Sequence, residues 1–274
     1  MAFDFEIILA LAFLLTMLVW VYDRIVFRPK RLIALQQLSE EALAAMPKEA
    51  KERLANTPKW VAEIKSYFVI VLLIFGVRSF VVEPFQIPSG SMLPTLEVGD
   101  FILVNKFDYG LRLPVFNTML IPTTEPKRGD VIVFKYPKDP SQNYIKRLIG
   151  LPGDVISYKN KRLMINGELV EESFQAKLPP SKKNQGIPVT QYEENLLGVE
   201  HLIYKNFRDN DLEGDWVVPD GHYFAIGDNR DNSLDSRKWG MIPSANMKGR
   251  AIYIWMHWES FFSLPSFRTN GTIQ

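Results

Sequence analysis

The pattern of hydrophobic and polar positions begins with a long apolar run, "IILALAFLLTMLVWVY", that starts at Ile7. Counted to Phe27, the run is long enough to cross a lipid bilayer, which needs about 20 residues. A cleaved signal peptide is the alternative, but no basic residue precedes the run and no small-residue cleavage site follows it directly. The pattern therefore favours a first transmembrane helix over residues 1–27.

A second apolar run, "YFVIVLLIFGV", starts at Tyr67 and lies between Lys65 and Arg78. Long basic side chains at the ends of an apolar helix can extend to the membrane interfaces, so the run predicts a second transmembrane helix over residues 60–82. A buried helix of a soluble core is the alternative for a run this short.

The segment between the two runs, residues 28–59, is rich in basic side chains, whereas the residues before the first run have none. The positive-inside rule therefore predicts that this segment is cytoplasmic and that both termini face outward. The part of the chain from about Glu83 onward would then work outside the cytoplasm. The basic residues are Arg28, Lys30, Arg31, Lys48, Lys51, Arg53 and Lys59.

Beyond Pro84 the pattern changes to short runs rich in Val, Ile, Phe and Tyr, separated by Gly, Pro, Asp and Asn. In "RLMINGELV" an Asn-Gly pair between apolar flanks predicts a β-hairpin. Strands and helices do not alternate, so the expected fold is mainly β and antiparallel. The expected strands are "FILVNKF", "DVIVFKY", "NYIKRLIG", "DVISY", "HYFAIGD" and "RAIYIWMHW".

The stretch from Phe174 to Val217 is more polar, has many turn residues and shows weak periodicity. It predicts a smaller accessory lobe over residues 155–219, inserted into the main β domain. The main β domain would then consist of residues 83–154 and 220–274.

Composition excludes several kinds of chemistry. The formal net charge is only +1, so the whole chain gives no sign of a nucleic-acid partner. The absence of cysteine excludes disulfides, thiol catalysis and thiolate metal sites. Only His201, His222 and His257 are present, in separate contexts, which leaves little material for a histidine metal cluster or a Ser-His-Asp triad.

Two serines in "IPSGSMLPTL" raise the possibility of a nucleophile directly after the second apolar run. A serine hydroxyl needs a neighbouring base, and a lysine can be that base only when its amine is neutral. Burial lowers a lysine pKa. In "NYIKRLI" strand alternation would place Lys146 on one face between Tyr144 and Leu148. Lys106 and Lys135 also lie in apolar runs, so the pattern leaves three candidate bases.

Four stretches together resemble the bacterial type I signal peptidases, also called leader peptidases of the inner membrane. They are "PSGSMLPTL", "GDVIVFKYP", "YIKRLIGLPGD" and "GDNRDNSLDSRKWG". The resemblance covers both apolar runs and the outer β domain, and matches the accessory lobe only loosely. It implies a membrane-bound serine endopeptidase that removes signal peptides after a small-x-small site, such as Ala-x-Ala, through an acyl-enzyme.

The resemblance also assigns roles to individual residues. It implies that Ser91 is the nucleophile and Lys146 the general base, in preference to Lys106 and Lys135. The backbone N–H of Ser91 and the hydroxyl of Ser89 would form the oxyanion hole. Gly90 would let the backbone approach the substrate closely.

The last of the four stretches would support the base. On the resemblance, Ser233 would hydrogen-bond the Lys146 amine, and Asp235 with Arg237 would form an ion pair that braces Ser233. An EF-hand is the alternative, but counted from Asp228 it lacks the required glycine and glutamate. We expect neither a metal ion nor another cofactor.

Small residues at the cleavage site require shallow apolar pockets, because only steric exclusion rejects larger side chains. The resemblance implies that Phe85, Ile87, Leu96, Tyr144 and Ile145 line these pockets, although they can equally be ordinary core residues. The substrate would bind as an added strand beside Ile87 or Ile145.

The expected partners are precursor proteins that carry signal peptides, together with membrane lipid. Trp255, Trp258, Phe261 and Phe262 near the C-terminus suit a membrane interface, or a last core strand. The expected location is the bacterial inner membrane, with the catalytic domain on the periplasmic side. Two alternatives are a self-cleaving serine-lysine protease and a membrane-anchored β domain that binds a partner and catalyses nothing.

Overall fold

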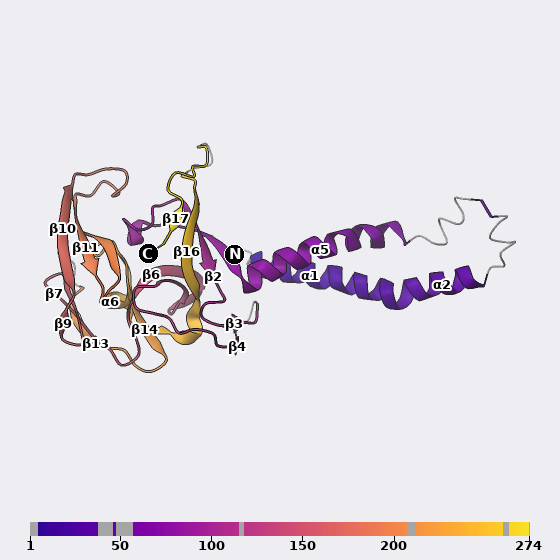
Figure 1. Cartoon of the computed structure of the whole chain (residues 1–274), viewed down its shortest axis with the longest axis horizontal. Coiled ribbons are helices and arrows are strands. Elements are labelled where there is room, and N and C mark those ends of the chain that lie inside the picture. The colour runs from indigo at the N-terminus through magenta and orange to yellow at the C-terminus, as the bar shows by residue number, and fades with distance from the viewer. Residues whose placement is uncertain are drawn as a thin grey trace. The chain divides into compact units, whose positions relative to one another are not determined.

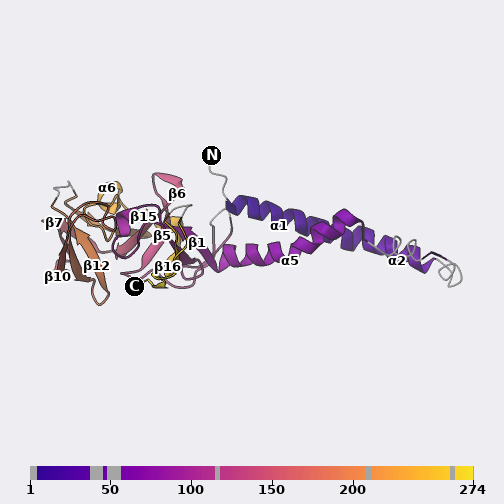
Figure 2. The same ribbon diagram turned by 90° about the horizontal axis from the view of Figure 1, so that it is seen from above.

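The computed structural model describes residues 5–37, 46–47, 57–114, 118–207, 212–259 and 263–273. The chain divides into two compact units, a helical one up to Ser79 and a β unit from Phe80 onward. Figures 1 and 2 show the helices and the strands of the two units. Lys48, Lys51, Arg53, Phe261 and Phe262, named in the sequence predictions, lie outside the described residues.

The helical unit contains two antiparallel helices that lie side by side (Figure 1). The first begins as α1, Phe5–Tyr22, passes through a π-helical turn, Asp23–Phe27, and continues as α2, Arg28–Gln36. The second is α5, Lys59–Phe80. The segments Phe5–Ile33 and Lys59–Phe80 are each long and apolar enough to cross a membrane.

Aromatic stacking and one buried carboxylate join the two helices. The rings of Phe13 and Phe75 stack with their centroids 4.8 Å apart. The carboxylate of Asp23 accepts hydrogen bonds from Arg31 and from Lys65 of α5. Most large apolar side chains of α1 and α5 are exposed, as in helices that face lipid.

The β unit is mainly antiparallel, as the sequence pattern predicted. Its main sheet has eight strands in the order β1-β2-β16-β5-β6-β14-β15, with β17 paired to β16. These are β1 (Val82–Gln86), β2 (Asp100–Asn105), β5 (Val131–Tyr136), β6 (Asp139–Gly150), β14 (His222–Ile226), β15 (Ile242–Pro243), β16 (Met247–His257) and β17 (Gly271–Thr272).

Strand β1 begins before Pro84, so the apolar Val82 belongs to the sheet and not to the end of the second helix. Proline is tolerated there because β1 lies at the edge of the sheet and needs hydrogen bonds on one side only. A short two-stranded sheet, β3 (Leu111–Arg112) with β4 (Met119–Ile121), follows β2.

Two smaller sheets occupy most of residues 155–219, the segment predicted to form an accessory lobe. One has the order β13-β7-β8-β9 and the other β10-β11-β12. In Figures 1 and 2 they gather at the end of the β unit opposite β16. Their strands are β7 (Val155–Lys159), β8 (Arg162–Ile165), β9 (Glu168–Leu169), β10 (Glu171–Leu178), β11 (Val189–Asn195), β12 (Glu200–Lys205) and β13 (Gly214–Val217).

The predicted Asn-Gly hairpin is confirmed. Strands β8 and β9 pair antiparallel on either side of Asn166 and Gly167. These two residues have φ values of 54° and 84°, which are the positive values that a type I′ turn requires.

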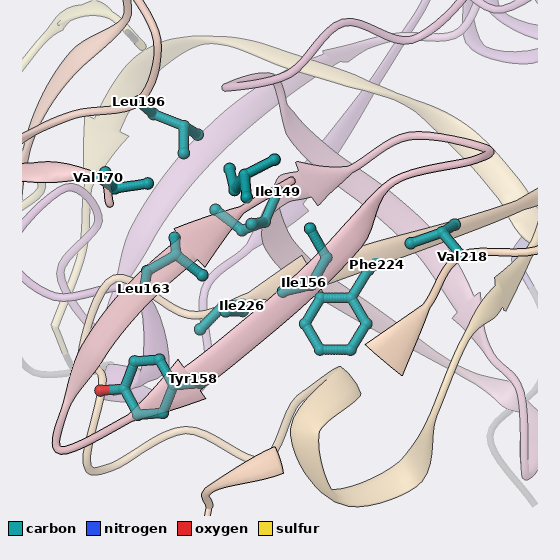
Figure 3. Packing of buried hydrophobic residues seen from close by; sticks show 10 residues of the cluster. Ile149, Ile156, Tyr158, Leu163, Val170, Leu196, Val218, Phe224 and Ile226 are labelled. Atoms are coloured by element: carbon teal, nitrogen blue, oxygen red, sulfur yellow. The ribbon is translucent and has the colours of Figure 1, made fainter. Parts of the chain in front are cut away.

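An apolar cluster packs the main sheet against the small sheets (Figure 3). Ile149 and Phe224 come from the main sheet, while Ile156, Tyr158 and Leu163 come from β7 and β8. All five side chains are at most 1% exposed, so this cluster anchors the C-terminal ends of β6 and β14. Strand β6 carries Lys146, and β14 leads directly into the segment that starts at Gly227.

Candidate active site

Ser91 lies in a short turn between β1 and β2. Ser89 is extended, and Gly90–Met92 then form one turn of 3-10 helix. The side chains of Ile87, Met92 and Leu96 are buried in the main sheet's core, which holds the turn against the sheet. Ser91 is 8% exposed, so its hydroxyl lies in a largely dry environment.

The structure places Lys146 next to Ser91. Its Nζ atom lies 2.7 Å from Ser91 Oγ and donates to the carbonyl oxygen of Ile145 over 2.8 Å. Lys106 instead forms an ion pair with Glu83. Strand alternation had predicted that Lys146 lies near Tyr144, and the Nζ atom is 5.6 Å from the centre of that ring.

Burial sets the protonation of Lys146. Its side chain is 4% exposed, and removal from water lowers its pKa from 10.5 to about 8, although Asp235 and Asp228 oppose this shift. About a tenth of the amine is therefore neutral at pH 7, far more than for a lysine with the ordinary pKa. The site contains a hydroxyl and a basic amine in hydrogen-bonding distance, the arrangement that nucleophilic catalysis requires.

Ser89 lies close to the same hydroxyl. The Ser89 and Ser91 Oγ atoms are 3.5 Å apart, and the Ser89 side chain is exposed. A donor at this position is available to a charge that develops on a substrate bound at Ser91.

Sequence reasoning missed the residues that hold the backbone of the turn. Asn229 donates from its side chain to Gly90 O over 2.9 Å and from its backbone to Ser91 O over 3.1 Å. A Cβ atom on Gly227 would lie 2.4 Å from Ser91 O, so only glycine fits there. Both residues lie in the motif "GDNRDN", which the resemblance included without giving them a role.

Ser233 is placed beside this contact. Its Oγ atom would lie 2.2 Å from a Cβ atom on Gly227, which is the residue that touches the Ser91 backbone. The expected hydrogen bond from Ser233 to Lys146 is not found among the described residues. The Ser233 hydroxyl instead lies near the Asp235 carboxylate, whose pKa it helps to lower. The reason is geometric, because Lys146 is directed toward Ser91 and the Ile145 carbonyl.

The expected ion pair between Asp235 and Arg237 is present and buried. Arg237 Nε donates to Asp235 Oδ1 over 2.9 Å, and Nη2 donates to Oδ2 over 2.7 Å. Burial would raise the Asp235 pKa, but the adjacent guanidinium outweighs it and holds the pKa below its usual value. Asp235 also accepts from the Gly227 backbone, which connects this pair to the site.

A second buried pair involves Arg147, the residue next to Lys146. Arg147 donates from Nε and Nη2 to the two carboxylate oxygens of Asp228, over 2.9 and 2.8 Å. Thr95, in the same turn as Ser91, donates to Asp228 as well. Strand β6 therefore places Lys146 beside Ser91 and Arg147 beside Asp228, in the loop that contacts the Ser91 turn.

Most of the predicted pocket residues lie together. Phe85, Ile87, Leu96 and Ile145 belong to one apolar cluster, in which Ile87 and Leu96 are fully buried. Tyr144 belongs to the neighbouring cluster and stacks on Tyr136. No group of histidine, aspartate and glutamate side chains suited to a metal ion is found in the part of the chain that the structure describes.

Comparison with known proteins matches this chain to signal peptidases by family, by sequence and by structure search. Residues 60–258 match the family described as "Signal peptidase, peptidase S26". The chain is 46% identical over 288 residues to a signal peptidase I of Pseudomonas aeruginosa, and the match covers 100% of both chains. It is 44% identical over 290 residues to one of Pseudomonas fluorescens, again over 100% of both. A crystal structure of a signal peptidase I from Enterococcus faecalis V583 is 29% identical, with a TM-score of 0.30, over 46% of this chain and 97% of that one.

Proposed function

The chain belongs to the peptidase S26 family of signal peptidases, and we propose that it removes signal peptides with Ser91 as nucleophile and Lys146 as general base. The observation that carries the proposal is the 2.7 Å separation of Lys146 Nζ and Ser91 Oγ in a buried site. A neutral amine at that distance can take the hydroxyl proton as Ser91 attacks.

The proposed reaction has two stages. The Ser91 oxygen attacks the carbonyl carbon of the last small residue of the signal peptide, and its proton moves to Lys146. The tetrahedral intermediate carries a negative oxygen, which the Ser91 N–H and the Ser89 hydroxyl stabilise. Lys146 then protonates the leaving amine, and the acyl-enzyme is hydrolysed by a water molecule that Lys146 deprotonates.

Substrate selection rests on the apolar cluster beside the turn. Phe85 and Ile145 are partly exposed and can touch an extended substrate, whereas Ile87 and Leu96 shape the pocket floor from below. We propose that this apolar surface accepts alanine-sized side chains and rejects larger ones by steric exclusion. The preferred site is therefore small-x-small, as in Ala-x-Ala.

Membrane attachment fits the two candidate helices, Phe5–Ile33 and Lys59–Phe80. We place both in the bacterial inner membrane, with residues 28–59 in the cytoplasm and the β unit in the periplasm. The half-buried Trp255 and Trp258 add a surface that can contact lipid, and Trp255 also packs against Phe101.

The test is cleavage of a secretory precursor with an Ala-x-Ala site by the detergent-solubilised full chain. We expect the wild type to cut after the last alanine and Ser91→Ala to lose at least about a thousandfold in kcat, because no other group forms the acyl-enzyme. Thermal unfolding serves as the control that the variant is folded.

Equal cleavage by both proteins would remove Ser91 from the reaction. A folded wild type that cleaves nothing would favour a β domain that only binds its partner.

A further inference from the structure

The loop between β10 and β11, residues 179–188, reaches the turn that carries Ser91; we refer to it as the lobe loop. A Cβ atom on Gly90 would lie 2.4 Å from Gln185 Nε2 and 2.5 Å from Gln185 Cδ. The Gln185 carboxamide therefore lies directly on the Cα atom of Gly90. Gly90 immediately precedes the proposed nucleophile, so the amide sits at the edge of the reaction site.

Several contacts hold the lobe loop in this position. Asn232 Nδ2 donates to Gln185 Oε1 over 2.8 Å. Lys183 pairs with Glu97, at the end of the Ser91 turn, over 3.1 Å. The loop is thus fixed to the turn and to the segment that follows Asn229, and the placement of Gln185 does not depend on one contact.

The Ser91 turn has one side against the main sheet and another against the lobe. Ile87, Met92 and Leu96 pack into the core of the main sheet. Leu93 instead packs in a separate cluster with Val189 and Tyr204, which belong to β11 and β12. Gln185 therefore covers the side of the turn that faces away from β1 and β6.

The Gln185 amide nitrogen is available to a ligand. Its oxygen is used by Asn232, but no hydrogen bond in the described part of the chain uses its nitrogen, and the side chain is exposed. A carboxamide nitrogen carries two N–H donors. Two donors next to the nucleophile therefore point to an acceptor that arrives with the substrate.

We propose that Gln185 determines how the enzyme holds the mature part of its substrate, by donating a hydrogen bond to a main-chain carbonyl just after the scissile bond. The proposal rests on Ser91 being the nucleophile. The signal-peptide side is expected beside Ile87 and Ile145, on the sheet side of the turn. The chain that continues past Ser91 leaves on the lobe side, where Gln185 lies.

A main-chain acceptor is the chemistry that suits this position. The mature segments of different precursors share their peptide backbone and not their side chains. A single carboxamide that donates a hydrogen bond to a main-chain carbonyl can therefore bind every precursor. The same hydrogen bond would hold the leaving amine in position to be protonated. This gives the accessory lobe a role in the reaction.

The test compares two synthetic peptides with the same Ala-x-Ala site. The long peptide continues for several residues beyond the scissile bond. In the short peptide the last alanine carries an ethylamide, so the scissile amide is present but no carbonyl follows it. The measured quantity is the ratio of kcat/KM for the long peptide to that for the short one, with the full chain in detergent. We expect the wild type to prefer the long peptide.

Gln185→Ala should lower this ratio about three- to tenfold, the usual effect of one hydrogen bond. Gln185→Glu should lower it as much, because it keeps the shape and the acceptor but has no N–H donor. Gln175→Ala is the matched control, since Gln175 is an exposed glutamine on β10 whose side chain donates to Ser173 and Glu193. It should keep the wild-type ratio.

An unchanged ratio in Gln185→Ala would overturn the proposal. An equal loss on both peptides would also overturn it, because it would show that Gln185 only supports the turn. A wild type that cleaves neither peptide would refute the proposed peptidase mechanism itself, which is a different result.

Discussion

Burial and two nearby carboxylates have opposite effects on the pKa of Lys146. Burial favours the neutral amine, and the carboxylates favour the charged form. Burial is the larger effect and brings the pKa to about 8, while Asp235 and Asp228 keep it from falling further. Each carboxylate is also paired with its own arginine, Arg237 or Arg147, which limits its effect on the lysine. The ion pairs around the site therefore tune the base as well as support it.

Activity should depend on pH with the sign set by this lysine. Only the neutral amine accepts a proton, so kcat/KM should fall about tenfold per unit as the pH drops below about 8, and should level off above it. The measurement is a pH profile of peptide cleavage by the full chain. Lys146→Arg should be as inactive as Lys146→Ala, because guanidinium does not deprotonate.

Two results would contradict a lysine base. One is an active Lys146→Arg variant. The other is a fall in kcat/KM whose midpoint lies at a pH of about 4, which would assign the proton transfer to a carboxylate.

Gly90 shows how one residue can have two explanations. The resemblance attributes its missing side chain to close approach by the substrate. The structure adds that the Gln185 amide occupies the space a side chain would need. Since the obstacle is the end of a flexible side chain, the glycine is needed only while Gln185 stays in place.

At the scale of elements, the segment from Gly227 to Asp235 joins the site to the lobe. Tyr204 of β12 donates its backbone N–H to Asp228 O, and Arg230 donates its own to Tyr204 O, each over 2.9 Å. Arg230 also reaches Glu194 on β11, with Nη1 2.7 Å from Oε1. The burial of Glu194 by itself would raise its pKa, but the charge of Arg230 has the larger effect and lowers that pKa.

Removing one member of this buried pair should destabilise the β unit strongly. Arg230 and Glu194 side chains are 1% and 0% exposed, so Glu194→Gln leaves an uncompensated charge and should cost about 3–5 kcal/mol of unfolding free energy. Glu194→Leu combined with Arg230→Met removes both charges and should cost much less. Denaturant unfolding of the full chain, followed by tryptophan fluorescence, measures both.

The matched control is Lys159→Ala, because Lys159 and Asp215 form an exposed pair at 54% and 57% exposure. An exposed pair contributes about 1 kcal/mol at most. A Glu194→Gln variant that unfolds like this control would show that the buried pair contributes little to stability.

At the scale of the whole molecule, the proposed orientation follows from two apolar helices and the basic segment between them. The helices expose most of their large apolar side chains, which in water would be strongly unfavourable. The same exposure is favourable in lipid, so the helical unit is suited to a bilayer and the β unit, with its own buried core, to water.

The orientation can be measured by cysteine labelling, because the chain contains no cysteine of its own. Gln37→Cys, in the segment proposed to be cytoplasmic, should resist a membrane-impermeant maleimide in intact spheroplasts and react after permeabilisation. Ser141→Cys, exposed on β6, should react in intact spheroplasts. The reverse pattern would invert the proposed topology.

The sequence alone determined the features that depend on local pattern. Apolar run length predicted two long helices, and short runs of β-branched and aromatic residues between turn residues predicted most strands of the main sheet. Asn166-Gly167 predicted a turn because few other pairs tolerate two positive φ values. Strands β10 to β13 of the lobe were not predicted individually, since β10 and β11 are partly exposed on both faces and their residues do not alternate clearly.

The site needed the tertiary structure, because its parts are distant in sequence. The pattern left Lys106, Lys135 and Lys146 as candidates, and the family resemblance alone favoured Lys146. The pairing of β6 with its neighbours brings Lys146 next to Ser91, which lies 55 positions earlier in the sequence. Asn229, Gly227 and Gln185 carry no local signal, since their roles arise from contacts with a turn that precedes them by more than ninety residues. Local sequence determines the elements, whereas the lysine pKa and the amide beside Gly90 depend on packing between elements.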